Sequence, residues 1–233
     1  MVGWEAQDFS HSNLRYTLLM VGGMPVSGLM AFPEGACEVG ARPGWIGYVR
    51  VDDVEAFAAR VKAAGGAILR DLTSLPFGRI AIVADPQGAP FVLFKPSRTE
   101  PCEAPAHCTP GRTGWHELHA ADQGSAFAFY ADLFGWTTEA FGPATMFRLP
   151  GYVGGEPRQP VSREVVATMS AANGAGAPGW GVNLWDRDVD ATTAKAVELG
   201  GRALAPPFDT PMTRMAVLAD PGGAAFSIAN VPG

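Results

Sequence analysis

Charged residues are scarce in this chain, and those present form no basic cluster. Asp, Glu, Lys and Arg together make up 17% of the 233 residues, and the formal net charge is −6. Contact with nucleic-acid phosphates needs concentrated positive charge, so nucleic acid is not expected to be the main partner. The expected partner is a small organic molecule.

Long apolar runs and a recognisable leader segment are also missing. Although 47% of the residues are hydrophobic, no apolar run approaches the roughly 18 residues that span a membrane. The start Met-Val-Gly-Trp lacks the basic-then-apolar layout of a secretory signal. The three cysteines form an odd count without framework spacing, which is typical of reduced thiols. The sequence therefore predicts a soluble, cytoplasmic protein that has no membrane partner.

What the chain does contain is an internal duplication. Shifted by 135 positions, Pro43–Phe94 aligns without a gap on Pro178–Ala229, and 19 of the 52 positions are identical. Chance would give about three matches at roughly 6% per position. A weaker match at a shift of 132 aligns Gly3-Trp4 with Gly135-Trp136. The pattern predicts a duplicated protein.

Each copy has regular boundaries between its expected elements. The apolar segments Trp45–Val51 and Trp180–Asp186 predict strands, and the Asp residues that follow them predict helix N-caps. Two strands joined by an Asp-Pro-x-Gly turn then follow, as at Arg79–Ala84 and Ala89–Phe94. Upstream in the second copy, Trp115–Ala121 predicts a strand that leads into a helix capped by Asp122. The repeating unit is therefore expected to be a βαβββ module, and pairs of modules are expected to curl into half-open barrels.

The repeat also sets the expected domain boundaries. Residues 1–97 form the expected first domain, the Pro-rich residues 98–112 a linker, and residues 113–233 the second domain. The segment matching Trp115–Phe134 falls before residue 1, so the first domain is expected to lack its opening strand and helix. Such a barrel exposes an apolar face and an unpaired edge. Either a start about twenty residues upstream or a second chain in a homodimer is expected to cover them.

This order of elements resembles the vicinal oxygen chelate superfamily, which includes glyoxalase I, bleomycin-resistance proteins and extradiol dioxygenases. The resemblance covers nearly the whole chain. It depends on Phe-Tyr-Ala-Asp-Leu-Phe-Gly-Trp at Phe129–Trp136, on Val51-Asp52-Asp53-Val54 and on the two Asp-Pro-x-Gly turns. It implies an α+β fold of tandem glyoxalase-like domains, and it indicates a fold more firmly than a reaction.

The superfamily binds a divalent metal through His, Gln or Glu side chains of the first, fifth and eighth strands. Matched by motif, these positions hold Trp115, Gly181 and Ser227 in this chain. They do not form a competent ligand set, because a cation needs at least three imidazole, carboxylate or thiolate donors. No metal and no other cofactor is therefore expected. The disfavoured alternative is a divalent metal at unorthodox positions such as Glu117, His119 and Glu164.

Strand alternation predicts which side chains would line the pocket of each copy. Glu117 and His119 are the candidate catalytic pair, because an imidazole exchanges protons near neutrality. Bonding of this pair to backbone groups is the structural alternative. Most of the candidate ligand-binding residues share a pocket-facing strand position. Arg79 and Arg214 instead occupy a repeated position that suits an anion clamp or a structural ion pair. The candidates are Trp115, Asn183, Trp185, Arg214 and Ser227 in the second copy and Tyr48, Arg50 and Arg79 in the first.

Two functions of different class stay open at this point. In the first, the protein binds a small molecule in a metal-free cleft, as the resemblance to bleomycin-resistance proteins implies. In the second, it is a lyase or oxidoreductase that acts on a reactive carbonyl or aromatic compound through Glu117 and His119. The missing ligand set favours the binding protein.

Overall fold

The computed structural model describes residues 2–10, 15–31, 42–97, 108–142, 144–153, 162–172 and 178–231. Most of the expected Pro-rich linker, 98–112, lies outside these ranges. Within them the fold is α+β, as predicted, and contains three helices among many short strands. No helix in the described part of the chain is both long and apolar enough to cross a membrane.

The strand–helix–three-strand order occurs three times. The first module holds β4 (Tyr48–Arg50), α1 (Val54–Ala63), β5 (Ala67–Leu75), β6 (Gly78–Ala84) and β7 (Pro90–Pro96). The second holds β8 (Thr113–Ala120), α2 (Gln123–Phe134), β9 (Thr137–Phe141), β10 (Ala144–Arg148) and β11 (Val165–Ala171). The third holds β12 (Gly179–Asp186), α3 (Val189–Glu198), β13 (Arg202–Asp209), β14 (Arg214–Ala219) and β15 (Ala225–Asn230). The predicted βαβββ modules are confirmed.

Three further strands precede these modules and form an antiparallel sheet in the order β1-β2-β3. They are β1 (Glu5–Asp8), β2 (Tyr16–Val21) and β3 (Met24–Met30). The incompleteness of the first domain and its cover by an upstream segment or a second chain stay predictions. β4, Tyr48–Arg50, is shorter than the predicted strand Trp45–Val51.

Each helix begins at the aspartate that the sequence indicates. The Asp53 carboxylate accepts hydrogen bonds from the amides of Glu55 and Ala56, and Asp122 does the same for Gly124 and Ser125. The Ala56 amide is the main reason that the pKa of Asp53 lies below its ordinary value. Asp188 caps α3 through the Ala191 amide. All three predicted N-caps are confirmed.

The chain forms two compact units, and each combines residues from both copies of the repeat. The first unit contains 1–45, 106–114 and 182–233, and the second contains 46–105 and 115–181. The predicted domain boundaries at residues 97 and 113 are drawn from the sequence repeat, whereas these units are defined by compactness. The predicted boundaries stay a prediction.

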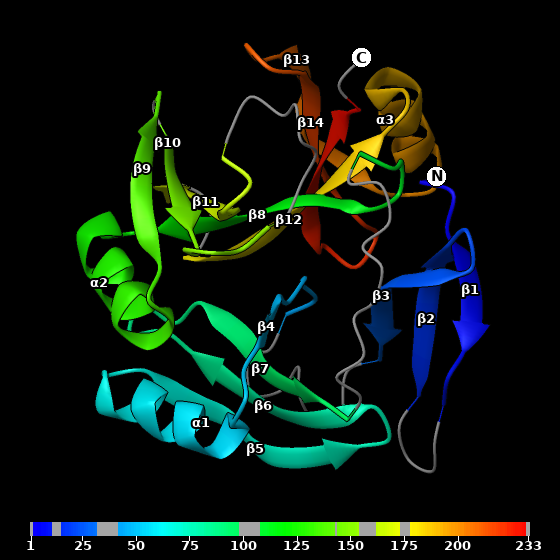
Figure 1. The fold of residues 1–233 in the computed structure, drawn as a ribbon. Helices are drawn as coiled ribbons and strands as arrows, with labels where there is room; N and C mark the ends of the chain where they lie inside the picture. The colour runs from blue at the N-terminus through cyan, green and yellow to red at the C-terminus, as the bar shows by residue number, and fades with distance from the viewer. Residues whose placement is uncertain are drawn as a thin grey trace. The chain divides into compact units, whose positions relative to one another are not determined.

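In the first unit, α3 packs on the strands β12, β15, β14 and β13, which neighbour one another in that order (Figure 1). Its core combines Val182 and Leu184 with side chains from the helix and the strands, such as Val189, Leu218 and Ile228. The buried Asp186 accepts hydrogen bonds from the hydroxyl of Thr192 at the start of the helix.

In the second unit, α1 lies along one face of the sheet β4-β7-β6-β5 (Figure 1). The strands β8, β11, β10 and β9 neighbour one another and carry α2. The two helices meet through stacked rings, Phe57 of α1 and Phe134 of α2, whose centroids lie 5.7 Å apart. One aromatic and aliphatic core thus joins the two modules of this unit.

Tyr130 of α2 lies fully buried at the centre of that core. Its hydroxyl donates to Asp85 at 3.0 Å and accepts from the indole nitrogen of Trp180 at 2.9 Å. Burial, together with the charge of Asp85, raises the pKa of Tyr130 far above its ordinary value, so the phenol stays protonated. Asp85 also holds its own turn by accepting from the amides of Gln87 and Ala89. One hydroxyl therefore links α2, the β6–β7 turn and the start of β12.

We expect the substitution Tyr130→Phe to destabilise the protein by about 1–3 kcal/mol, because it leaves the indole N–H of the half-buried Trp180 and an oxygen of the buried Asp85 without a partner. The free energy of unfolding in urea measures this loss. Tyr152→Phe is the matched control, since Tyr152 is exposed and should change stability by less than about 0.5 kcal/mol. Equal stability of Tyr130→Phe and the wild type would show that the linkage contributes nothing.

Candidate functional site

The side chains of β8 alternate between two environments. Leu118 and Ala120 are buried in the core of the second unit, whereas Trp115, Glu117 and His119 share the opposite face and are only half-buried. His116 has the same parity as Leu118, and desolvation by the surrounding protein lowers its pKa below the ordinary value. The predicted common face of Trp115, Glu117 and His119 agrees with this burial pattern.

Glu117 and His119 are joined by a serine from the neighbouring strand. β11 runs parallel to β8 and places Ser170 opposite His119. The Ser170 hydroxyl lies 2.9 Å from Oε1 of Glu117 and 3.0 Å from Nδ1 of His119. These three residues form a continuous polar chain, which we call the Glu117–Ser170–His119 chain.

The hydrogen bonds of this chain indicate which nitrogen of the neutral His119 ring carries the proton. The Ser170 hydroxyl donates its one O–H to Oε1 of Glu117. The Ser170 oxygen must then accept from Nδ1–H of His119. In the neutral ring this leaves Nε2 with its lone pair, which makes Nε2 the acceptor of the group.

The lone-pair side of His119 lies beside a glycine. A Cβ atom at Gly181 would lie 3.6 Å from Nε2 of His119 and 3.7 Å from the carbonyl oxygen of Glu117. That spacing is ordinary van der Waals contact, so any side chain here would pack on the imidazole. Gly181 therefore places no side chain beside Nε2, at the position where the resemblance places a metal ligand.

The residues present do not fit the divalent metal that the fold family implies. At the three matched positions, Trp115 offers an indole, Gly181 offers no side chain, and the Ser227 hydroxyl is hydrogen-bonded to Asn183. The alternative ligand Glu164 is bound by Arg148 and by the amide of Gly151. Across the ranges that the structure describes, no three His, Cys, Asp or Glu side chains lie close enough to hold an ion.

The candidates of the first unit form a second polar group. Nδ2 of the buried Asn183 donates to Ser227 at 2.9 Å, while its Oδ1 finds no donor among the described residues. A Cβ at Gly114 would come within 2.9 Å of that oxygen and 3.0 Å of the Trp185 ring. The glycine at 114 is therefore needed for Asn183 and the buried Trp185 to hold their positions.

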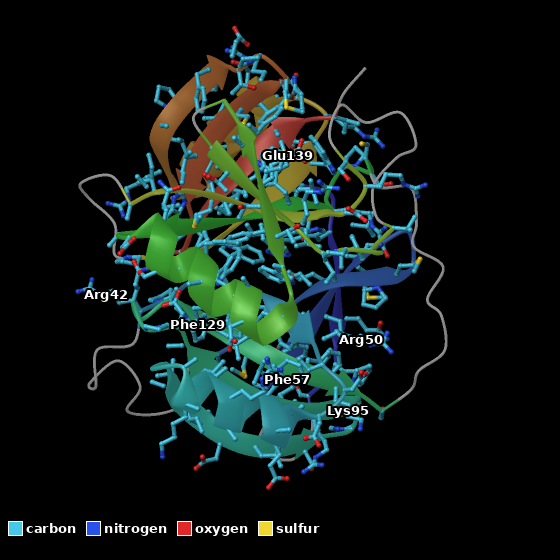
Figure 2. The ribbon with its side chains drawn as sticks, turned by 60° about the vertical axis from the view of Figure 1, so that its left-hand side comes forward. Arg42, Arg50, Phe57, Lys95, Phe129 and Glu139 are labelled. Carbon is cyan, nitrogen blue, oxygen red and sulfur yellow. The ribbon has the colours of Figure 1, made fainter. Side chains whose placement is uncertain are left out.

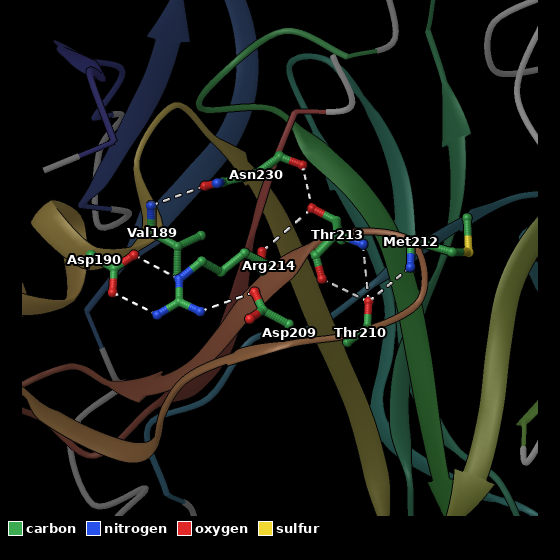
Figure 3. Close-up of polar contacts among 8 residues, drawn as sticks. All are labelled: Val189, Asp190, Asp209, Thr210, Met212, Thr213, Arg214 and Asn230. Carbon is green, nitrogen blue, oxygen red and sulfur yellow. Dashed lines mark hydrogen bonds and ion pairs between the residues drawn. The ribbon is translucent and has the colours of Figure 1, made fainter.

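Arg214, by contrast, is engaged by the protein itself (Figure 3). Its guanidinium donates to both carboxylate oxygens of Asp190, at 2.6 and 2.9 Å, and to Asp209 at 3.0 Å. These partners raise the pKa of Arg214 above its ordinary value, and Arg214 in turn lowers that of Asp190. We call these three residues the Arg214 cluster. Arg214 therefore forms the structural ion pair that the sequence analysis gave as the alternative to an anion clamp. Contact of Arg214 with a ligand stays a prediction.

The first-copy candidates occupy two faces of the sheet β4-β7-β6-β5. Tyr48 packs edge-on against Phe94 with ring centroids 5.8 Å apart, and Arg50 lies in register with Phe94 on the same side. Arg79 shares its face with the buried Ala81 and Val83, which pack toward α1. Arg79 therefore lies on the opposite face of the sheet from Tyr48 and Arg50.

The residue that the sequence analysis missed is Ser170. Its strand alternates, since Ala167 and Met169 are buried while Thr168 and Ser170 are half-buried. That pattern could have marked Ser170 as a neighbour of the exposed face of β8. The parallel register that brings it to His119 has no local signal in the sequence.

Comparison with known proteins places the chain in a family. The description "Glyoxalase-like domain" matches residues 116–229, and "Glyoxalase/Bleomycin resistance protein/Dioxygenase superfamily" matches residues 41–93. The anthracycline biosynthesis protein DnrV of Streptomyces peucetius is 35% identical over 189 residues, covering 80% of this chain and 66% of DnrV. The chain thus spans just under two thirds of the length of that relative.

A second relative is matched over more of its length. "Putative glyoxylase CFP32" of Mycobacterium tuberculosis is 33% identical over 215 residues, which cover 91% of this chain and 79% of CFP32. Two solved structures share the fold at a TM-score of 0.56: a Mn(II)-bound glyoxalase from Novosphingobium aromaticivorans, at 14% identity, and 2,2',3-trihydroxybiphenyl 1,2-dioxygenase from Sphingomonas wittichii, at 16%. The alignments cover 99% and 98% of this chain and 75% and 81% of those proteins. The chain belongs to the glyoxalase/bleomycin resistance protein/dioxygenase superfamily.

Proposed function

We propose that this protein binds a small organic molecule without the divalent metal of its superfamily. The observation that carries the proposal is the donor set at the inherited positions, where Trp115, Gly181 and Ser227 replace metal ligands. Instead of a cation, the β8 face offers an indole, a carboxylate and an imidazole acceptor next to the open side of Gly181. Such a surface suits a ligand that combines a flat apolar body with polar edges.

The relatives favour an aromatic ligand. DnrV and a similar protein, DauV, 36% identical to this chain, are named for anthracycline biosynthesis. We infer by this kinship that the ligand is a flat polycyclic compound, with Trp115 stacking on the rings and His119 accepting from a phenol or hydroxyl group. The odd cysteine count, which is typical of reduced thiols, supports a cytoplasmic place for this binding.

We expect purified protein to retain no stoichiometric zinc, nickel, manganese or iron after dialysis, as measured by plasma mass spectrometry. Doxorubicin, a fluorescent anthracycline, serves as the binding probe and should bind equally with and without EDTA. Trp115→Ala should weaken its binding by about three- to tenfold, which corresponds to the loss of one stacking contact.

Leu199→Ala is the control for these measurements, because Leu199 is exposed at the end of α3 in the other compact unit. It should leave doxorubicin binding unchanged. A metal retained at one ion per chain would contradict the metal-free proposal. Unchanged doxorubicin affinity in Trp115→Ala would contradict the stacking role of Trp115.

The second candidate function is catalysis, and the Glu117–Ser170–His119 chain is the observation that favours it. Its hydrogen bonds hold the Nδ1 proton and leave Nε2 as a base beside Gly181. In this proposal the enzyme is a lyase or oxidoreductase acting on a reactive carbonyl or aromatic compound. Nε2 of His119 removes a proton from carbon next to a carbonyl group and later returns it.

We expect imidazole ¹⁵N spectra to show His119 as the Nδ1–H tautomer at a pH where the ring is neutral, and Ser170→Ala to abolish that preference. The hemithioacetal of methylglyoxal and glutathione is the catalytic probe. An enzyme would exchange its carbon-bound proton in D₂O, His119→Gln would abolish the exchange, and Ser170→Ala would slow it about tenfold.

These results separate the two functions. Doxorubicin binding without proton exchange supports the binding protein alone, whereas exchange that needs His119 supports the enzyme. A wild-type Nε2–H tautomer would contradict the base role of Nε2.

A further inference from the structure

A small hollow opens in the second unit, on the sheet that α1 covers. It has a volume of about 280 Å³ and is lined by Ser74, Leu75, Gly78, Arg79, Lys95, Pro96 and Ser97. Arg79 and Lys95 are direct cross-strand partners in the antiparallel pair β6–β7. Two like charges in that relation repel each other, so the fold maintains an unfavourable pair here.

Two carboxylates at the start of α1, Asp53 and Glu55, lie near this pair, but neither binds it as closely as Asp190 and Asp209 bind Arg214. Arg79 reaches Glu55 only at 4.0 Å, and the side chains are 49% and 78% exposed. No carboxylate in the described part of the chain comes within salt-bridge distance of Lys95. The charges of Lys95 and Arg79 help the Ala56 and Glu55 amides to lower the pKa of Asp53, so their field extends over the start of α1.

The internal repeat supplies a matched comparison. With the shift of 135, Arg79 corresponds to Arg214, Glu55 to Asp190, and Ser74 to Asp209. In the first unit both aspartates bind Arg214 (Figure 3). In the second unit, the position of one of these carboxylates is occupied by the serine at 74, whose hydroxyl carries no charge.

Position 95 also makes the second unit more positive than the first, because it holds a lysine where the repeat has the uncharged Asn230. Lys95 corresponds to Asn230, whose Oδ1 accepts from the Val189 amide at the start of α3. Lys95 lies at the end of its sheet, toward the same end as Arg50 (Figure 2). The four matched positions thus carry one Arg and two Asp in the first unit, but one Arg, one Lys and one Glu in the second. The charge of these four positions is therefore more positive in the second unit, and the matched N-cap aspartates, Asp53 and Asp188, add one negative charge to each unit.

We propose that the Arg79–Lys95 hollow binds the carboxylate of a small organic acid, which takes the place that Asp209 fills in the Arg214 cluster. The guanidinium of Arg79 and the ammonium of Lys95 contact the carboxylate, and the hydroxyls of Ser74 and Ser97 add donors. Leu75 and Pro96 contact the apolar part of the acid. This site is separate from the β8 face and does not depend on the function proposed for it.

Benzoate is the probe, because it joins a carboxylate to a small apolar ring, and benzamide is its neutral match. In ¹H–¹⁵N spectra of the full chain, benzoate should shift the Gly78 and Ser97 amides and the Arg79 Nε–H signal in a saturable way. Benzamide should not shift them. Inorganic phosphate should shift the same signals, since it is also an oxyanion. It should bind more weakly than benzoate, because it has no apolar ring to contact Leu75 and Pro96.

Ser74→Asp is the decisive variant, since it places in this hollow the carboxylate that the repeat has at Asp209. It should weaken benzoate binding at least about tenfold while keeping or raising the Tm, so a loss of binding cannot be attributed to unfolding. Arg79→Gln should abolish the shifts, and Arg214→Gln should leave them unchanged. Undiminished binding in Ser74→Asp, equal shifts with benzamide, or no saturable shift with benzoate would each overturn the proposal.

Discussion

Burial of one sheet face under a helix is the constraint on which the other features of this protein depend. In the second unit α1 and α2 cover Ala81, Leu93, Leu118 and Ala120, and every residue of opposite parity must then lie on the other face. Glu117 and His119 share a face because Leu118 between them is held in the core. The polar chain with Ser170 is therefore a consequence of apolar packing elsewhere in the same strand.

The same constraint decides how much of the fold and site could be predicted. The Asp caps, the Asp-Pro-x-Gly turns and the alternation of β8 are local, so residues such as Asp122 and His119 could be placed from sequence. Ser170 could not, because its position opposite His119 depends on the register of the parallel pair β8–β11, between residues 51 apart in the chain. The link from Tyr130 to Asp85 is equally non-local, and the aspartate in a turn motif gives no sign of its buried partner.

Duplication makes the differences between matched positions informative. Where Arg214 has two carboxylate partners, Arg79 has a distant glutamate and a lysine neighbour, although both arginines lie in the first two residues of equivalent strands beside equivalent helices. Backbone geometry is thus common to the two positions, and the side chains alone decide whether the guanidinium is neutralised within the chain. Arg214 contacts two carboxylates at 3.0 Å or less, whereas the carboxylate of Glu55 lies 4.0 Å from Arg79.

The loss of metal ligands has a comparable effect on the chemistry available to the fold. A bound cation would be the largest local charge and would dominate the behaviour of every neighbouring group. With Trp115 and Gly181 at the inherited positions, the orientation of protons falls to hydrogen bonds, as in the chain from Glu117 through Ser170 to Nδ1 of His119. Such a chain leaves one acceptor atom on the neutral imidazole, Nε2 of His119.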